Sequence, residues 1–372
     1  MGFSCGIVGL PNVGKSTIFN ALTSAKAASE NFPFCTIEPN TGVVPVPDPR
    51  LSNLAKLASS AKTIPTQMTF VDIAGLIKGA ASGEGLGNQF LSHIRSVDAI
   101  AHVVRCFEDE NIIHVEGTVD PIRDIETIDT ELGLADLDSV QKQATRVAKN
   151  AKSGNKEALN KVEALKQLEE HLGNGLPART WESDLDKETI ADVLSQLLTA
   201  KPVLFVANVE EDLAMLSLDE AVTKNSFLNK LNSYASDNSA EIVMISGKLE
   251  AELSELSADE KVEYLEELGL ESPGLDRLIL AGYKLLNLIT FFTVGPKEAH
   301  AWTVIKDSSA PKCAGKIHTD FEKGFIRAEV IAYKDYAEAG SELKAKEAGK
   351  LRTEGKEYLC KDGDIMHFRF NV

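Results

Sequence analysis

Residues 9–17 read Gly-Leu-Pro-Asn-Val-Gly-Lys-Ser-Thr, which is the spacing of a phosphate-binding turn. Its glycines let backbone N–H groups close around phosphate oxygens at the positive end of the helix that follows. In this spacing Lys15 bridges the terminal phosphates, and the hydroxyl of Ser16 is a ligand of Mg²⁺. The predicted nucleotide-binding residues of the turn are Asn12, Val13, Gly14, Lys15, Ser16 and Thr17.

A second motif, Thr-Phe-Val-Asp-Ile-Ala-Gly, occupies residues 69–75 and places Asp72 at the end of an apolar run. In nucleotide hydrolases this carboxylate holds the Mg²⁺ shell, usually through a water, and the glycine N–H senses the γ-phosphate. A threonine in the loop between the two motifs is the usual further ligand of Mg²⁺, and Thr36 is the candidate. We therefore predict Mg²⁺ as a cofactor with Ser16, Thr36 and Asp72 as ligands, and Lys15 and Gly75 as catalytic residues.

The segment Asn208-Val209-Glu210-Glu211 follows a later apolar run, where a guanine-specific enzyme has Asn-Lys-x-Asp. Val209 has no long stem to cover a base, and the carboxylate of Glu211 reaches one methylene further than that of an aspartate. Guanine selectivity therefore stays open. The predicted base-pocket residues are Asn208, Val209, Glu211, Ser246 and Gly247.

The position after Gly75 holds Leu76, where many GTPases carry a glutamine that orients the attacking water. An apolar side chain cannot orient water by hydrogen bonding. His114 is the candidate from residue chemistry, because a neutral imidazole can accept a proton from water. A histidine held only by local backbone contacts is the competing interpretation.

Short apolar runs precede these motifs and predict strands at residues 3–8, 42–46, 68–71, 99–104, 202–208 and 241–246. Nearly continuous, β-branched runs are typical of strands buried on both faces of a mostly parallel sheet. A helix is predicted over residues 15–25, and helical segments lie between most of the strands. The pattern predicts a doubly wound α/β domain.

Two further regions differ from the rest of the chain in composition and in the spacing of their apolar residues. Residues 132–200 contain two apolar stripes of helical spacing that are separated by a break at 153–155, which predicts an inserted antiparallel helical hairpin. This hairpin is either a structural insert or an arm that docks a partner. After a helix over 275–288, short apolar runs at 291–294, 301–305, 325–331 and 365–370 predict a small separate α+β domain.

The composition indicates an acidic, globular, cytoplasmic protein: 39 Lys and Arg stand against 56 Asp and Glu in 372 residues, a net charge of −17. The five scattered cysteines indicate reduced thiols, and neither a leader peptide nor a membrane span is expected. Any contact with RNA needs a local basic patch. Candidates for such a patch, or for an ordinary solvated face, are Lys306, Lys312, Lys316, Lys323 and Arg327.

With these motifs together, the chain closely resembles the YchF / Obg-like ATPase family of translation-factor class P-loop proteins. The resemblance covers essentially the whole chain, including residues 9–17, 31–39, 72–76 and 208–211 and the segment 314–328. It implies a GTPase-like fold that prefers ATP, an inserted coiled-coil domain and a C-terminal TGS domain of the ubiquitin-like β-grasp type. The implied domains are 1–131 and 201–284 for nucleotide binding, 132–200 for the coiled coil and 285–372 for TGS.

The resemblance further implies a slow, Mg²⁺-dependent ATPase that associates with the ribosome, through the large subunit or the whole particle, and is linked to stress responses. RNA is a candidate partner of the TGS domain, and K⁺, bound with the help of Asn12, is a candidate second cofactor. Two alternatives stay open. One is an Obg-type GTPase of ribosome assembly, and the other is a ribosome-binding or RNA-binding module in which the nucleotide is mainly structural.

Overall fold

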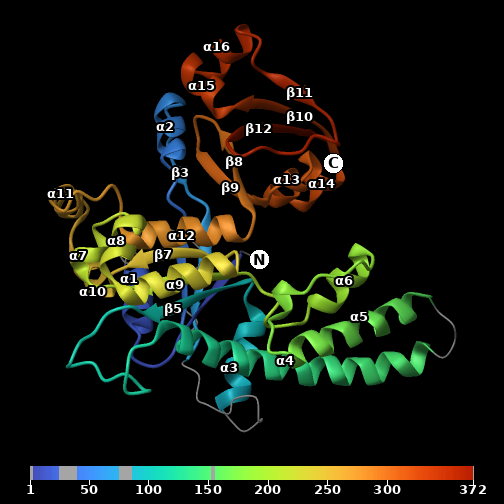
Figure 1. Ribbon diagram of the computed structural model, residues 1–372. Helices are drawn as coiled ribbons and strands as arrows, with labels where there is room; N and C mark the ends of the chain where they lie inside the picture. Colours follow the sequence, from blue (N-terminus) through green and yellow to red (C-terminus); the bar gives the residue numbers. More distant parts are fainter. Residues whose placement is uncertain (1–2, 25–39, 75–85, 152–155, 372) are drawn as a thin grey trace. The chain divides into compact units, whose positions relative to one another are not determined.

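The computed structural model describes residues 3–24, 40–74, 86–151 and 156–371 of the chain (Figure 1). The chain divides into two compact units, Met1–Val44 with Thr69–Ala281 and Pro45–Met68 with Gly282–Val372. Among the described helices, none is both long enough and apolar enough to cross a membrane.

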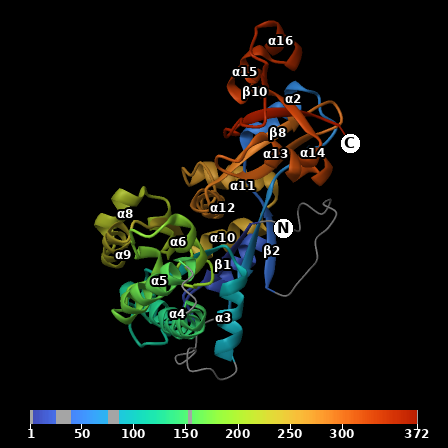
Figure 2. The same ribbon diagram turned by 90° about the vertical axis from the view of Figure 1, so that its right-hand side faces the viewer.

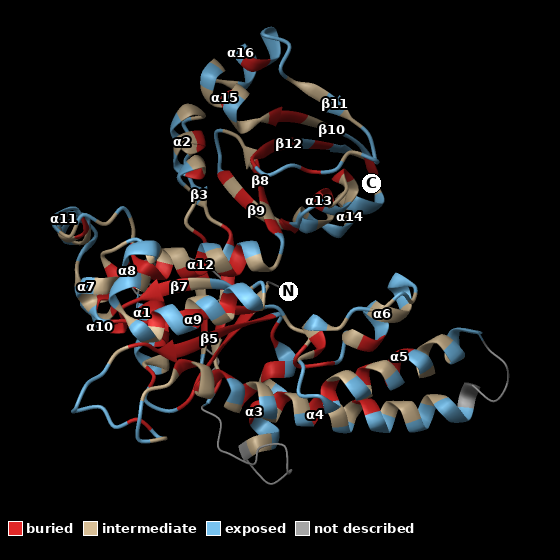
Figure 3. Cartoon of the chain, in the orientation of Figure 1, coloured by how far each residue is buried: buried red, intermediate tan, exposed pale blue. Residues whose placement is uncertain are grey.

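The first unit is built on a six-stranded sheet of order β2-β4-β1-β5-β6-β7. Its strands are β1 (Ser4–Val8), β2 (Thr41–Pro45), β4 (Gln67–Asp72), β5 (Ala99–Arg105), β6 (Val203–Asn208) and β7 (Glu241–Ile245). The pairs β1–β4, β1–β5, β5–β6 and β6–β7 are parallel. Every residue of β5 and β6 is buried, as Figure 3 shows in red along the centre of this sheet. The predicted doubly wound α/β fold is confirmed.

Helices surround this sheet, and those within residues 121–194 form a helical arm beside it. They are α1 (Lys15–Ser24), α3 (Leu86–Ser96), α4 (Pro121–Ala151), α5 (Lys156–Gly173), α6 (Lys187–Leu194), α7 (Glu211–Ala214), α8 (Leu218–Lys224), α9 (Ser226–Asp237), α10 (Gly247–Glu255), α11 (Ala258–Glu267) and α12 (Gly274–Leu285), with a short 3₁₀ turn at Ala178–Thr180. Figure 2 shows α4 and α5 lying side by side. Their apolar stripes meet in a buried core that includes Val140, Leu165 and Leu168, so the predicted helical hairpin is present.

The second unit has its own six-stranded sheet, of order β11-β10-β12-β8-β9-β3. Its elements are α2 (Pro49–Leu57), β3 (Thr63–Ile64), β8 (Leu288–Val294), β9 (Ala299–Ile305), α13 (Ala310–Ile317), α14 (Thr319–Lys323), β10 (Phe325–Ala332), α15 (Tyr333–Ala339), α16 (Glu342–Glu347), β11 (Arg352–Glu354) and β12 (Asp364–Phe370). Two buried clusters stabilise it, one containing Phe291 with residues of α13 and one containing Phe292 with residues of α2, α15 and α16. The predicted C-terminal α+β region is confirmed.

Residues 45–68 differ from the expected assignment, which placed them within 1–131. They group with the C-terminal residues because Leu51 and Leu54 of α2 pack in the Phe292 cluster. β3 also pairs in parallel with β9. The apolar stripe of α2 predicts an amphipathic helix, but a stripe alone does not specify which core receives it.

Candidate active site

The phosphate-binding turn lies between the end of β1 at Val8 and the start of α1 at Lys15. Gly14 has a φ of 95°, and a Cβ at this position would overlap the side-chain amide of Asn208. Only glycine therefore fits. The first N–H groups of a helix have no intrahelical acceptor, so α1 offers donors to a phosphate at this end. The predicted strand, turn and helix are all present.

Lys15 and Asp72 meet at the ends of α1 and β4, where the Nζ of Lys15 lies 3.7 Å from Oδ1 of Asp72. Parallel pairing of β1 with β4 aligns Ile7 with Asp72 and so brings the two motifs to one edge of the sheet. Oδ1 of Asp72 is buried and has no hydrogen-bond partner among the described residues. A buried, unsatisfied carboxylate oxygen beside the hydroxyl-bearing first turn of α1 suits a hard, hydrated cation such as Mg²⁺.

Two predicted site residues, Thr36 and Gly75, lie outside the described residues, and so does Leu76. Their assigned roles as a Mg²⁺ ligand and as a sensor of the γ-phosphate therefore stay predictions. The described site consists of the turn, Asp72 and the loops that follow β5, β6 and β7.

Asn208 joins three of these segments. Its Nδ2 donates to the carbonyl of Val13 at 2.9 Å, and its Oδ1 accepts from the N–H of Gly247 at 3.0 Å. Its own carbonyl accepts from the N–H of Cys106 at 2.8 Å. These contacts fix the phosphate-binding turn against the base loops, and they leave one Nδ2 proton and one Oδ1 lone pair, so the predicted role of Asn208 in the base pocket stays a prediction.

A pocket of about 600 Å³ opens beside the turn, a size that suits a nucleotide base and sugar. It is lined by Asn12, Gly14, Thr17, Phe107, Glu108, Asp109, Ile112, Asn208, Val209, Glu210, Glu211, Asp212, Ser246, Gly247, Lys248 and Ala251. The structure thus brings Asn12, Gly14 and Thr17 of the turn together with the predicted residues of both base loops, whereas Val13, Lys15 and Ser16 do not line this pocket. Ser246 also caps α10, since its side chain accepts from the N–H of Leu249.

Three of the groups that line the pocket contact other groups of the protein. The N–H of Val209 donates to the carbonyl of Ile245 at 2.9 Å, so it cannot donate to a base. Lys248 Nζ lies 2.7 Å from Oε1 of Glu211, and this hydrogen bond raises the pKa of Lys248 above its usual value. This ion pair lies at the pocket rim, where the Lys248 side chain is mostly exposed.

Phe107 was missed as a site residue by the sequence analysis. Ligands of open α/β sheets bind outside the carboxyl ends of the strands, and Phe107 follows the end of β5 by two residues. That position was the available signal for Phe107. Lys248 follows the predicted Ser246 and Gly247 directly in the chain.

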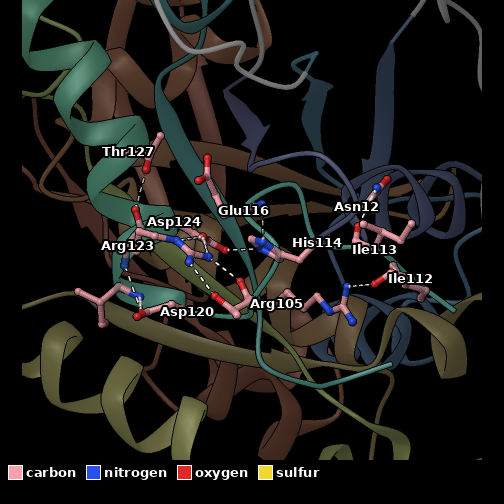
Figure 4. Close-up of polar contacts among 12 residues, drawn as sticks. Asn12, Arg105, Ile112, Ile113, His114, Glu116, Asp120, Arg123, Asp124 and Thr127 are labelled. Atoms are coloured by element: carbon pink, nitrogen blue, oxygen red, sulfur yellow. Dashed lines mark hydrogen bonds and ion pairs between the residues drawn. The ribbon is translucent and has the colours of Figure 1, made fainter. Parts of the chain in front are cut away.

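His114 is buried, and both of its ring nitrogens are bonded (Figure 4). Nδ1 accepts from the N–H of Glu116 at 3.2 Å, so Nε2 carries the proton that it donates to Oδ2 of Asp124 at 2.8 Å. In this conformation the ring therefore has no nitrogen left for a water. The competing interpretation, a histidine held by backbone contacts, accounts for the contact with Glu116 but not for the contact with the Asp124 side chain.

Asn12 of the turn reaches the same loop. Its φ is 64°, and its Nδ2 donates to the carbonyl of Ile113 at 3.1 Å (Figure 4). The phosphate-binding turn and the segment that carries His114 are therefore tied by one direct hydrogen bond.

Two protein families match parts of this chain. Residues 4–135 match a family described as 50S ribosome-binding GTPase. Residues 288–371 match the YchF-GTPase C-terminal family, whose description is a protein of unknown function.

Several named relatives are similar over the full length. The ribosome-binding ATPases YchF of Haemophilus influenzae and Bacillus subtilis are each 54% identical over 373 residues, and that of Escherichia coli O157:H7 is 53% identical over 372 residues. All three alignments cover 100% of both chains. The structure of the Schizosaccharomyces pombe YchF GTPase matches with a TM-score of 0.86 at 37% identity, covering 99% of this chain and 98% of that one.

Proposed function

This chain belongs to the YchF family, and on that premise we propose that it is a ribosome-binding ATPase. It hydrolyses ATP to ADP and phosphate as a slow switch whose ATP and ADP states differ in affinity for the ribosome. The observation that carries the proposal is the meeting of Lys15 and Asp72 at the N-terminus of α1, beside a pocket of about 600 Å³. Phosphates would bind at Lys15 and the helix N-terminus.

Mg²⁺ would be held by Ser16, by Thr36 and, through water, by Asp72. It supplies charge neutralisation on the phosphates. The unsatisfied, buried Oδ1 of Asp72 supports this assignment from the chain's own residues.

The proposal is tested by measuring Mg²⁺-dependent phosphate release by the purified chain together with its sedimentation with ribosomes. Basal turnover at or below about 10⁻² per second is expected for such a switch without an activating arginine or glutamine. Turnover above roughly 10 per second contradicts a switch.

We propose that ATP is preferred over GTP. The N–H of Val209 is used by Ile245, so main-chain reading of the base at this position falls to a carbonyl. A carbonyl accepts from the amino group of adenine, whereas guanine presents a carbonyl oxygen at the same ring position and is repelled. The ion pair of Glu211 with Lys248 supports the same preference, because the lysine competes for the carboxylate that would otherwise accept from guanine.

We propose that His114 positions the attacking water once ATP binding releases its ring from Asp124. Catalytic hydrogen bonds often form only in the substrate complex, so the observed contacts do not remove the candidate. The hydrogen bond from Asn12 to Ile113 links the phosphate-binding turn to the loop that carries His114, so phosphate binding can change the position of this loop.

Substituting His114→Ala is expected to lower the turnover number about 100-fold, the usual contribution of general acid–base catalysis, with little change in the Kd for ATP. The measurement is single-turnover hydrolysis with a parallel binding titration. His171→Ala is the control, because that ring bonds in the helical arm with Pro177 and Thr180. Unchanged turnover in a folded His114→Ala variant contradicts the role.

K⁺ is proposed as a second cation, bound with the help of Oδ1 of Asn12, since Nδ2 is used by Ile113. A hydrolysis rate that falls when sodium replaces potassium is expected. A rate insensitive to this exchange excludes the role.

For the ribosomal partner we propose that unpaired RNA binds the TGS unit, which we place at residues 285–372. Residues 288–371 carry 14 Lys and Arg against 13 Asp and Glu, unlike the strongly acidic whole chain. An aromatic groove of about 490 Å³ lies on this unit and is lined partly by Trp302, Phe321 and Phe370. Phe321 stacks on Phe370 at 3.8 Å between ring centroids, and His300 stacks on Trp302 at 3.7 Å. Such rings are platforms for unpaired bases.

Substituting Trp302→Ala is expected to weaken binding of a short single-stranded RNA roughly 10-fold, which is within the usual contribution of one stacked base. Fluorescence anisotropy of labelled RNA at fixed salt measures the change. Ile326→Ala removes an exposed apolar side chain from β10 of the same unit and is expected to have no effect. Equal RNA affinity of the folded Trp302→Ala variant and the wild type rules out the groove.

The remaining domain limits are proposals too: nucleotide binding by 1–131 and 201–284, apart from residues 45–68, and an inserted coiled-coil domain over 132–200. We also propose a cytoplasmic location, where ribosomes work, and a role in translation-linked stress responses. Both follow from membership of the family.

A further inference from the structure

Arg105 ends β5 and is almost fully buried, with an exposed fraction of 1%. Its guanidinium donates to three main-chain carbonyls: Nε to Phe107 at 3.0 Å, Nη2 to Asp109 at 3.3 Å and Nη1 to Ile112 at 2.8 Å, the last of which is drawn in Figure 4. A buried cation destabilises a fold unless its donors are satisfied. Here the loop that follows β5 folds back over Arg105 and supplies those acceptors.

The groups that Arg105 holds have one property in common. Phe107, Asp109 and Ile112 all line the pocket of about 600 Å³, whereas Arg105 does not. The guanidinium carbon also lies 4.6 Å from the centroid of the Phe107 ring, within the range of a cation–π contact. One buried side chain therefore sets both the main-chain path of this wall and the position of its aromatic ring.

We propose that Arg105 is a positioning residue that shapes the base side of the ATP pocket. It does not touch the nucleotide, and it acts by holding residues 106–112 in the form that presents Phe107 to the base. This inference rests on the proposed function as an ATPase and adds a determinant of nucleotide affinity to it.

The effect of Arg105 should fall on binding more than on turnover. The next part of the loop has an anchor of its own, because Nδ2 of Asn12 donates to the carbonyl of Ile113. The Cys106 end of the loop is also fixed separately, since Asn225 Nδ2 donates to the carbonyl of Cys106 at 2.8 Å. Loss of Arg105 therefore frees the pocket wall between two points that stay fixed.

The test compares Arg105→Ala and Arg105→Lys with the wild-type full-length chain by titration of a fluorescent ATP analogue with Mg²⁺ and by steady-state hydrolysis. We expect Arg105→Ala to raise the Kd and KM for ATP roughly 10- to 100-fold, because three carbonyls lose their donor, with the turnover number changed only a few-fold. Lysine keeps the charge but not the fork of donors, so Arg105→Lys should recover only part of the affinity. Millimolar guanidinium should restore ATP affinity to Arg105→Ala and leave the wild type unchanged.

Arg179→Ala is the matched control. Arg179 is a mostly buried arginine of the same unit, but its ion pair with Asp129 at 2.7 Å belongs to the helical arm. ATP affinity should stay at the wild-type value in this control, and thermal unfolding of each variant reports folding separately. If Arg105→Ala does not fold, Arg105→Lys with its expected partial loss decides the question.

The two proposals fail in different ways. A wild-type chain that does not bind ATP contradicts the proposed function. A wild-type chain that binds ATP, alongside folded Arg105 variants with the same Kd and KM, overturns the role of Arg105 alone. The role of Arg105 is also overturned if guanidinium does not restore the lost ATP affinity. Added guanidinium should donate to the same carbonyls as the missing side chain.

Discussion

Replacing Lys15 with alanine is expected to reduce kcat/KM for ATP by at least about 100-fold, the scale seen when one preorganised donor to developing charge is removed. The ammonium group lies at the start of α1 and 3.7 Å from Asp72, where it would neutralise the terminal phosphates. Without this ammonium group, the Asp72 carboxylate would face the phosphate anion with one cation fewer between them. Phosphate release and a binding titration measure the two parts of the loss.

Lys161→Ala is the control for this variant, because Lys161 pairs with Asp192 at 2.5 Å in the helical arm. Surface ion pairs of this kind contribute little to stability, so its hydrolysis should equal that of the wild type. The Lys15 variant also separates two classes of function. A switch loses the nucleotide dependence of ribosome binding, whereas a binding module with a structural nucleotide retains ribosome association and its cellular effect.

The second large effect is expected for Asn208→Ala. Its side-chain amide is buried and bonded at both ends, to Val13 and to Gly247, and alanine leaves a buried carbonyl and a buried N–H without partners. Each lost partner costs about 1–3 kcal/mol, so the loss of both should lower the free energy of unfolding by about 2–6 kcal/mol. ATP affinity should fall together with stability, since the phosphate-binding turn loses its tie to the base loops.

Asn208→Asp isolates one of these contacts. Its carboxylate can still accept from Gly247 but repels the carbonyl of Val13, so ATP affinity should fall nearly as far as in the alanine variant. Denaturant unfolding and ATP titration of both variants check the expectation. Two folded variants with wild-type ATP affinity contradict the proposed tie between the turn and the base loops.

The local chemistry of this site could be predicted from the sequence because it depends on short spacing. Residues 9–17 contain the turn, the cation and the hydroxyls in one stretch, and the apolar run before Asp72 indicates a neighbouring parallel strand. Parallel strands end at the same edge of a sheet. The meeting of Lys15 with Asp72 therefore follows from two local patterns and one general rule.

The contacts of buried polar side chains and the contacts between distant segments were not predictable in this way. Nothing in the spacing around Arg105 shows that its donors turn back to the loop that follows it, since arginines are mostly exposed. The three hydrogen bonds of Asn208 join it to residues far away in the chain. The docking of α2 on the C-terminal unit likewise depends on which of two apolar cores it meets, and periodicity carries no such information.

The most direct test of the central claim is equilibrium competition between unlabelled ATP and GTP for the nucleotide-free protein, read with a fluorescent ATP analogue in Mg²⁺. A pocket that reads the base through a main-chain carbonyl near Val209, with Glu211 held by Lys248, predicts that ATP competes at lower concentration than GTP. Tighter competition by GTP would contradict that reading of the pocket and return the chain to the class of Obg-type GTPases.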